Sequence, residues 1–212
     1  MNNETGRVEA FSDGVFAIAI TLLILEIVVR VPHDPMSDAR LRADLLHLWP
    51  SYVAYFASFA TIGVMWLNHH RLFSLIAKND DGLGAYNLLL LLGVTWVPFP
   101  TALLASQLVA PSHRTAAVVY AVSFFALAIV FNLMWRYSVR RKLCRQHLDV
   151  DAITRQYAAG PVLYALLIGV GALNAVACLI LSAAIAVYFL LPPRLWRRTP
   201  GHAVEAGSGN SP

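Results

Sequence analysis

The stretch Arg7-Val-Glu-Ala-Phe-Ser-Asp-Gly-Val-Phe-Ala-Ile-Ala-Ile-Thr-Leu-Leu-Ile-Leu-Glu26 joins a charged, polar start to a strongly apolar helical run. Ser12 and Asp13 lie where the apolar run begins, and Thr21 lies near its middle. A polar group in hydrocarbon is costly, so each one needs a partner, a water-filled space or a function. The stretch therefore predicts a membrane helix whose polar positions have a specific role.

The composition of the whole chain indicates a membrane protein. Hydrophobic residues make up 58% of the 212 residues and charged residues only 13%, whereas a soluble domain carries roughly 25% charged residues. The net charge is +4, but no basic surface interleaved with aromatic residues is visible, so nucleic acid is not an expected partner. Cys144 and Cys178 lie far apart and form no CxxC pair, so neither a disulfide framework nor a zinc site is expected.

Hydropathy predicts an all-α protein with six membrane-spanning helices, because a span needs about 20 apolar residues. The six predicted spans cover approximately residues 8–31, 48–68, 83–108, 115–137, 153–172 and 175–191. Pro98 and Pro100 are expected to kink the third span, since each removes a backbone donor. The last two spans divide one long apolar block at a turn near Gly169, Gly171 and Asn174.

The segments outside the spans set the expected topology. Residues 1–191 form one six-helix domain, residues 33–44 an exposed loop, and residues 192–212 a disordered cytoplasmic tail. Twelve of the 16 Lys and Arg residues fall on the side of the termini, which places both termini in the cytoplasm and the chain in the cytoplasmic (inner) membrane. The basic cluster Arg136–Arg145 is explained as a topology determinant that touches lipid headgroups; a binding site for anionic lipid or a partner is the alternative.

One stripe of the first span has the pattern of a pore lining. Ile18, Thr21 and Leu25 follow Gly14 at steps of three and four residues, and Leu22 lies beside them. If symmetry-related copies faced each other, the stripe would give stacked rings, in which apolar side chains gate by dewetting and hydroxyls partly coordinate an ion. The alternative is an ordinary packing stripe, with the Thr21 hydroxyl bonded to its own helix.

Two interpretations also fit the polar start of this span. Ser12 and Asp13 could cap a helix, or side chains from neighbouring spans could hold them and fix the orientation of the stripe. The candidate partners are Arg7, Trp66, Asn68, His69, His70 and Asn87.

Other chemistry has little support in the sequence. Adjacent residues of a helix diverge by about 100°, so His69 and His70 make a poor chelate and no metal is expected. Glu26 and Arg30 are spaced for an i, i+4 ion pair, with cation attraction at an entrance as the alternative. Enzyme signatures and the Thr-Val-Gly-Tyr-Gly filter of potassium channels are absent. A secondary transporter stays open as an alternative, although no inverted repeat is evident.

Three motifs in order carry a family resemblance. They are Arg7-x-x-x-Phe11-Ser12-Asp13 with the apolar run after it, Trp66-Leu-Asn-His69-His70-Arg-Leu-Phe73, and Asn87 with Pro98-Phe-Pro-Thr101. The chain thereby resembles the prokaryotic transmembrane protein 175 family of potassium channels. The resemblance covers the first three spans by motif and the last three only by hydropathy and spacing.

The resemblance implies six-helix subunits that assemble as a homotetramer, with the first helix lining a central pore. It implies that Ile18 forms the pore constriction, Thr21 a hydroxyl layer associated with selectivity, and Leu25 a further ring, while Leu22 matches a position that lines the pore in some members. It also implies a structural role for Phe11, Ser12 and Asp13, bonded to polar residues of the second and third spans. The expected function is a potassium-permeable channel with no cofactor besides permeant K⁺; a proton leak pathway is an alternative.

Overall fold

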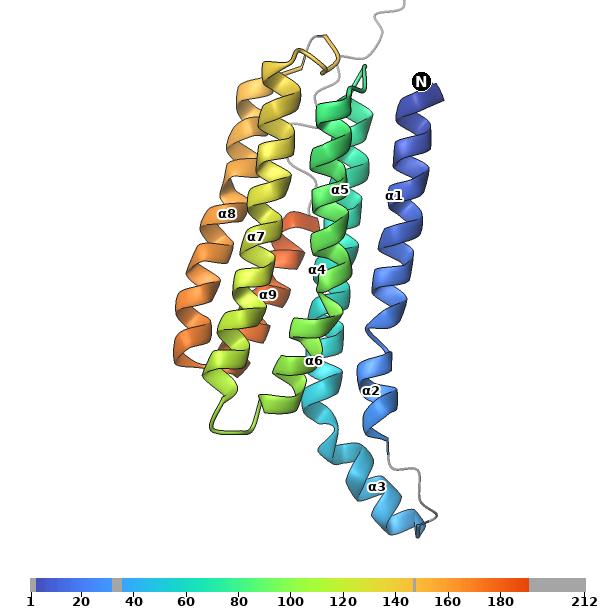
Figure 1. Cartoon of the computed structure of the whole chain (residues 1–212). Helices are drawn as coiled ribbons and strands as arrows, with labels where there is room; N and C mark the ends of the chain where they lie inside the picture. The colour runs from blue at the N-terminus through green and yellow to red at the C-terminus, as the bar shows by residue number, and fades with distance from the viewer. Residues whose placement is uncertain (1–2, 32–35, 147, 191–212) are drawn as a thin grey trace, which may run out of the picture.

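The computed structural model describes residues 3–31, 36–146 and 148–190, which fold into one bundle of helices (Figure 1). The predicted tail, 192–212, lies outside the described residues. The helices are α1 Asn3–Leu22, α2 Leu25–Arg30, α3 Asp38–His47, α4 Trp49–Leu75, α5 Asp81–Trp96, α6 Pro98–Gln107, α7 His113–Arg140, α8 Val150–Leu173 and α9 Ala175–Leu190. The prediction of an almost wholly helical membrane protein is confirmed.

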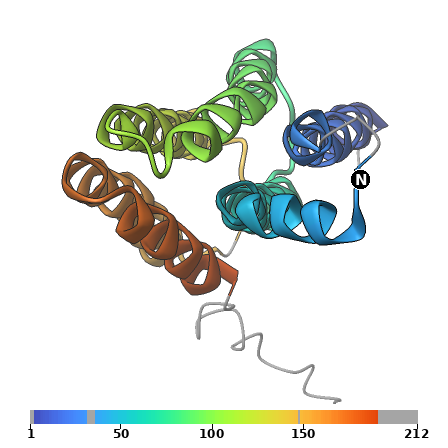
Figure 2. The ribbon, with the colours of Figure 1, turned by 90° about the horizontal axis from the view of Figure 1, so that it is seen from below.

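The arrangement places α4 near the centre and α1 at one edge of the bundle. Seen along the bundle axis, α1 stands beside α4 and α5, and α7, α8 and α9 lie on the other side of α4 (Figure 2). One long face of α1 therefore has no partner within the part of the subunit that the structure describes.

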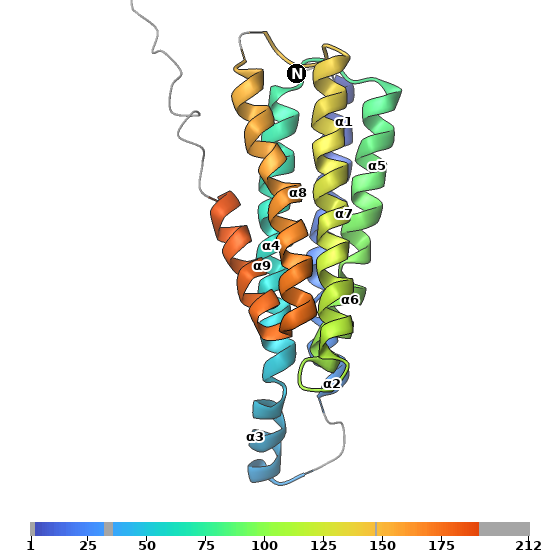
Figure 3. The same cartoon turned by 90° about the vertical axis from the view of Figure 1, so that its left-hand side faces the viewer.

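Five segments of the described chain are long and apolar enough to cross a membrane. They are Thr5–Arg30, Trp49–Leu75, Asp81–Gln107, His113–Arg140 and Val150–Leu173. The sixth predicted span corresponds to α9, an apolar helix of 16 residues that follows α8 after a turn at Asn174. At about 1.5 Å per residue it covers about 24 Å, less than a hydrocarbon core of about 30 Å, and Figure 3 shows it ending below the neighbouring end of α8. A sixth span stays a prediction.

Two segments differ from the expectation for loops. The predicted loop through Asp44 is wrong, because α3 occupies Asp38–His47 and projects from the bundle (Figure 1). The Ser37 side chain caps this helix by accepting from the Arg40 N–H at 3.4 Å, which stabilises it without burying any of its residues. α4 also runs two turns beyond the predicted end at Asn68, so His69 and His70 lie on a helix and not in a polar bridge.

The first and third predicted spans are both interrupted, but only the interruption of the third has a proline beside it. α5 ends at Trp96 and α6 begins at Pro98, where proline removes the donor that a continuous helix needs. α1 ends at Leu22 and α2 begins at Leu25, although no Pro or Gly lies between Gly14 and Pro32. The sequence predicts the first interruption and not the second.

The interior of the bundle holds a closed set of hydroxyl groups. Ser58 lies 2.8 Å from Thr101 and donates to Tyr120 at 3.2 Å, and Ser182 lies 3.3 Å from Tyr120 and 3.4 Å from Thr61. All five side chains are buried, and they come from α4, α6, α7 and α9. Because these groups satisfy one another, the cluster ties four helices together inside the subunit.

Two loops at the same end of the bundle are paired. The Ala77 N–H donates to the Leu143 carbonyl and the Arg145 N–H to the Leu75 carbonyl, both at 2.8 Å. Asp80 accepts a hydrogen bond from the Tyr137 hydroxyl at 3.1 Å and lies 3.6 Å from the Arg141 Nε. These contacts, called the loop latch below, join the α4–α5 connection to the α7–α8 connection.

Candidate functional site

The segment formed by α1 and α2 has one packed face and one open face. The packed face buries almost completely Phe16, Ala19 and Leu23. The open face carries the predicted stripe, with exposed fractions of 60% at Ile18, 41% at Leu22 and 49% at Leu25, and an exposed Thr21. Large apolar side chains that lie open along one stripe need lipid or another protein surface to cover them. Packing inside the subunit therefore does not explain the stripe.

Thr21 already uses its hydroxyl hydrogen. The Thr21 Oγ1 donates to the Ile18 carbonyl at 2.8 Å, within the same turn of α1. This is the local bond that the packing alternative expects, yet the side chain stays exposed on the open face. A hydroxyl that donates inward keeps its lone pairs as acceptors, so Thr21 can still offer oxygen to a cation.

A chain of hydrogen bonds joins α1 to α5 and α4 through Ser12. The Asn87 Nδ2 donates to the Ser12 Oγ at 2.9 Å, and the Asn87 Oδ1 lies 2.8 Å from the His69 Nε2. Ser12 itself donates to the Val8 carbonyl at 2.8 Å. All three linked side chains are buried, and the His69 ring packs against Phe16 and Phe73 with centroids 5.4 Å and 4.5 Å apart.

Asp13 and Glu9 provide two further ties between α1 and α4. The Trp66 Nε1 donates to the Asp13 Oδ1 at 2.8 Å. The His70 Nδ1 lies 2.7 Å from the Glu9 Oε1, a partner that sequence reasoning missed because Glu9 reads as one more charge before the apolar run. Since α1 begins at Asn3, neither Ser12 nor Asp13 caps its start, and the capping alternative is wrong. The Ser12, Asp13 and Glu9 contacts together are called the α1 anchor below.

Three other candidate residues lie outside these bonds. Asn68 donates to the Val64 carbonyl at 2.9 Å and accepts from Arg71 at 3.3 Å. Arg7 and Phe11 line an open groove between α1 and α5, and the Phe11 ring is exposed.

The structure gives Arg71 a contact to α9 that the sequence does not predict. Its guanidinium donates to the carbonyls of Phe189 and Leu190 at 3.5 Å each. A cation at the C-terminal carbonyls of a helix is favourable, so Arg71 fixes the end of α9 to α4.

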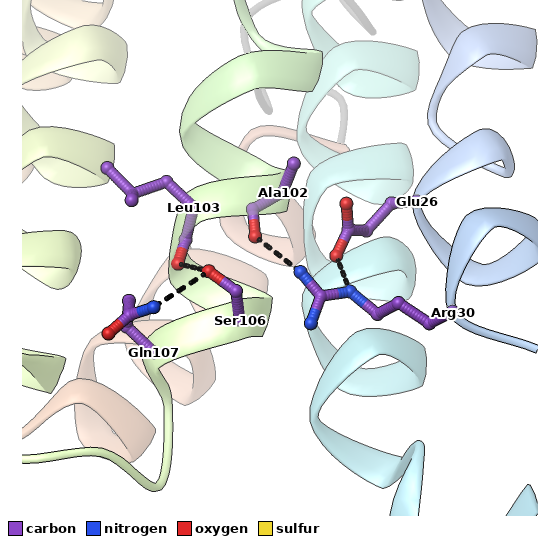
Figure 4. Close-up of polar contacts among 6 residues, drawn as sticks. All are labelled: Glu26, Arg30, Ala102, Leu103, Ser106 and Gln107. Atoms are coloured by element: carbon purple, nitrogen blue, oxygen red, sulfur yellow. Dashed lines mark hydrogen bonds and ion pairs between the residues drawn. The ribbon is translucent and has the colours of Figure 1, made fainter.

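Glu26 and Arg30 pair at the other end of the pore-lining candidate (Figure 4). The Arg30 Nε donates to the Glu26 Oε1, and the Arg30 Nη2 donates to the Ala102 carbonyl of α6 at 3.3 Å. The Glu26 side chain is largely buried. The i, i+4 pair expected from spacing is present, and it also ties α2 to α6. No cluster of three or more metal-ligating side chains occurs among residues 3–31, 36–146 and 148–190.

Comparison with known proteins places the chain among channels. Residues 7–98 match the family described as the endosomal/lysosomal potassium channel TMEM175. A potassium channel of Chamaesiphon minutus is 51% identical over 194 residues, which cover 89% of this chain and 95% of the relative. The human endosomal/lysosomal proton channel TMEM175 is 39% identical over 138 residues, 61% of this chain and 27% of the human protein.

The fold matches a solved structure over the same extent. The crystal structure of a lysosomal potassium-selective channel TMEM175 homolog from Chamaesiphon minutus aligns with a TM-score of 0.79 and 49% identity, covering 89% of this chain and 97% of the other. The resemblance drawn from three motifs is thus confirmed at the level of the family. The chain belongs to the TMEM175 family of channels.

Proposed function

We propose that this protein is a potassium-permeable channel that assembles as a homotetramer, with α1 and α2 of each subunit lining a central pore. Its relative of 51% identity is named a potassium channel, and the structure it matches is titled potassium-selective. With six spans per subunit, the excess of Lys and Arg on the side of the termini favours cytoplasmic termini in the inner membrane.

The observation that carries the proposal is the open stripe of α1 at the edge of the subunit. Ile18, Leu22 and Leu25 are exposed there, while the buried hydroxyl groups inside the bundle bond to one another. A pathway between copies of the chain uses the open stripe, and closed symmetry is the usual form of such assemblies. Four stripes around one axis would enclose a narrow apolar pore.

The stripe then has a gate and a polar layer. Rings of Ile18, Leu22 and Leu25 stop ions by dewetting when they are narrow, because a dehydrated ion has no ligands among apolar side chains. The Thr21 ring offers oxygen acceptors to a cation that has lost part of its hydration shell. The channel therefore conducts without a carbonyl filter of the Thr-Val-Gly-Tyr-Gly type.

The α1 anchor explains how the stripe keeps its orientation. A helix at the edge of a bundle can rotate about its axis unless specific bonds prevent it. Ser12 and Asp13 bind Asn87 and Trp66 on two different helices, so a rotation that moves Ile18 away from the axis breaks the buried Asn87–Ser12 bond and the exposed Trp66–Asp13 bond. Ser12 and Asp13 serve as structural contacts and not as ion ligands.

A flux assay on purified protein in liposomes tests the proposed function. With K⁺ inside and an impermeant cation outside, we expect K⁺ efflux that vesicles without protein do not show, and native mass spectrometry should give four copies. Absence of K⁺ flux, or a monomer as the only species in liposome-forming lipid, contradicts the proposal. Saturable uptake coupled to a second solute would indicate a secondary transporter.

Proton conduction is a second candidate function, because the human relative is named a proton channel. The same liposomes with a pH gradient and no permeant metal cation test it. Acidification of the lumen at a rate proportional to the gradient supports proton conduction through this protein, and an unchanged lumenal pH opposes it.

A further inference from the structure

A small cavity lies inside the subunit, beside the cluster of buried hydroxyl groups to which Thr61 belongs. Its volume is about 60 Å³, and its walls come from α4, α7, α8 and α9. Most of the wall is apolar, but four polar residues line it: Thr61 and Asn68 from α4, and Tyr157 and Tyr164 from α8. No lining residue belongs to α1 or α2, so the cavity is separate from the open stripe.

The two tyrosines of this cavity are buried but have no hydrogen-bond partner. Tyr157 and Tyr164 are 8% and 5% exposed, and their rings pack on other aromatic rings, Tyr157 edge-on to Trp135 and Tyr164 stacked on Phe124. Within the described chain, neither hydroxyl group bonds to a protein atom. A buried hydroxyl group without a hydrogen bond is costly. Each therefore needs a partner that the protein itself does not supply.

The polar groups lie at two levels along the bundle. α4 and α8 run in opposite directions (Figure 3), and on each helix the two polar residues are seven positions apart, which is about two turns or about 10 Å. Thr61 lies 3.4 Å from Ser182 of the hydroxyl cluster. Asn68 accepts from Arg71 at 3.3 Å, and Arg71 holds the end of α9. The cavity thus lies between the hydroxyl cluster and Arg71.

The free hydrogen-bonding capacity of the wall suits water. The Thr61 hydroxyl donates to the Ala57 carbonyl at 2.8 Å, so towards the cavity it can only accept. The Asn68 Nδ2 donates to the Val64 carbonyl at 2.9 Å and keeps a second N–H. A buried water needs two to four polar partners and takes about 30 Å³. The cavity has room for about two waters and offers both donors and acceptors.

We propose that this cavity is a binding site for about two water molecules, which hydrogen-bond to the hydroxyl groups of Tyr164 and Tyr157. The waters extend the polar interior of the subunit from the hydroxyl cluster towards Arg71, along a line that α1 does not touch. They satisfy the buried hydroxyl groups and join α8 to α4 across the cavity. Because every lining residue belongs to one subunit, the site does not depend on the proposed tetramer or its pore.

A high-resolution map of the intact protein tests the site directly. We expect solvent peaks in the cavity at about 2.5–3.0 Å from the hydroxyl oxygens of Tyr157 and Tyr164. Tyr164→Phe should cause loss of the peak beside residue 164, while the peak beside Tyr157 remains. A cavity without density, or one filled by the continuous density of a lipid chain, overturns the inference.

The melting temperature in detergent is a second readout, because a hydrated and a dry cavity predict different results for Tyr164→Phe. In a hydrated cavity the change removes one partner of a bound water, so the melting temperature should fall by about 2–4 °C. In a dry cavity it removes an unsatisfied hydroxyl group, so the melting temperature should stay the same or rise. The matched control is Tyr188→Phe on the exposed face of α9, which should melt like the unaltered protein. An unchanged or higher melting temperature in Tyr164→Phe contradicts the inference.

Discussion

Thr21 has two chemical roles on one atom. Its hydrogen serves the Ile18 carbonyl, and its lone pairs remain on the exposed stripe. A threonine used only for packing could be replaced by valine, which has the same shape, without any effect on conduction. A measurement of ion selectivity therefore distinguishes a Thr21 that only packs from a Thr21 that offers its oxygen to the permeant ion.

Thr21→Val should lower the ratio of K⁺ to Na⁺ permeability, because valine offers no oxygen to the ion; a total preference for K⁺ of about 0.7 kcal/mol at the Thr21 ring corresponds to a decrease of about threefold. The measurement is the reversal potential under bi-ionic conditions in a planar bilayer. Thr95→Val is the matched control, since the Thr95 hydroxyl also bonds within its own helix, on α5. An unchanged permeability ratio in Thr21→Val would show that Thr21 contributes to packing and not to selectivity.

Ser12→Ala should destabilise the subunit by leaving the buried Asn87 Nδ2 without a partner. An unsatisfied buried donor costs about 1–3 kcal/mol, and each kcal/mol shifts the melting temperature of a domain of this size by about 2–4 °C. We expect a decrease of about 5 °C in a detergent melting curve. Ser74→Ala, which removes only an exposed bond to the Arg71 carbonyl, should melt like the unaltered protein.

At the scale of helices, the sequence predicts those features that have a local cause. Pro98 interrupts its own helix, so the junction of α5 and α6 could be placed in advance. The interruption between α1 and α2 has no Pro or Gly beside it, and the Arg30 contact that joins α2 to α6 links residues 72 positions apart in the chain. Helix α3 was missed because prolines and charges before it outweighed the capping position of Ser37.

The loop latch depends on the ionised carboxylate of Asp80. The Leu83 N–H, the Tyr137 hydroxyl and Arg141 stabilise the charged form and lower the pKa of Asp80 below its ordinary value of 3.8. A lowered pKa means that the latch contributes its full stability above that ordinary value and loses it as the pH falls through the lowered pKa. Near neutral pH the latch should not respond to pH.

Asp80→Asn should weaken the latch at every pH at which the carboxylate is ionised. We expect faster hydrogen exchange at residues 76–80 and 141–145 at pH 7, by about fivefold if the loss is about 1 kcal/mol. Asp151→Asn, a change in the first turn of α8, should leave exchange in both loops unaltered. Equal exchange in Asp80→Asn and the unaltered protein would show that backbone pairing alone holds the loops.

At the scale of the whole molecule, the sequence predicted the apolar stripe and two partners of the α1 anchor, and it did not predict two of the charged contacts between helices. The stripe and the partners Asn87 and Trp66 follow from periodicity and motif, because they lie in the segments that carry the family resemblance. Glu9 and Arg71 were missed as contacts, since a charged residue gives no sign in sequence of which distant group it meets.

A four-fold pore predicts that equivalent positions of α1 approach one another across subunits. In a protein carrying Cys144→Ser and Cys178→Ser, Ile18→Cys should form a disulfide between subunits under mild oxidation, visible as dimers on a denaturing gel. Val162→Cys, on the exposed face of α8, should remain monomeric on the same gel. Cross-linking at Val162 with none at Ile18 would move the subunit interface away from α1.

The position of α1 at the rim of the subunit has a genetic consequence. If the pore exists only where four copies meet, one impaired copy prevents conduction by an assembly in which the other three copies are intact. A cell that makes equal amounts of intact and impaired copies would retain about one fully intact assembly in sixteen, if subunits mix at random. Alleles that damage the stripe without preventing assembly would then be dominant, whereas alleles that stop the subunit from folding would be recessive.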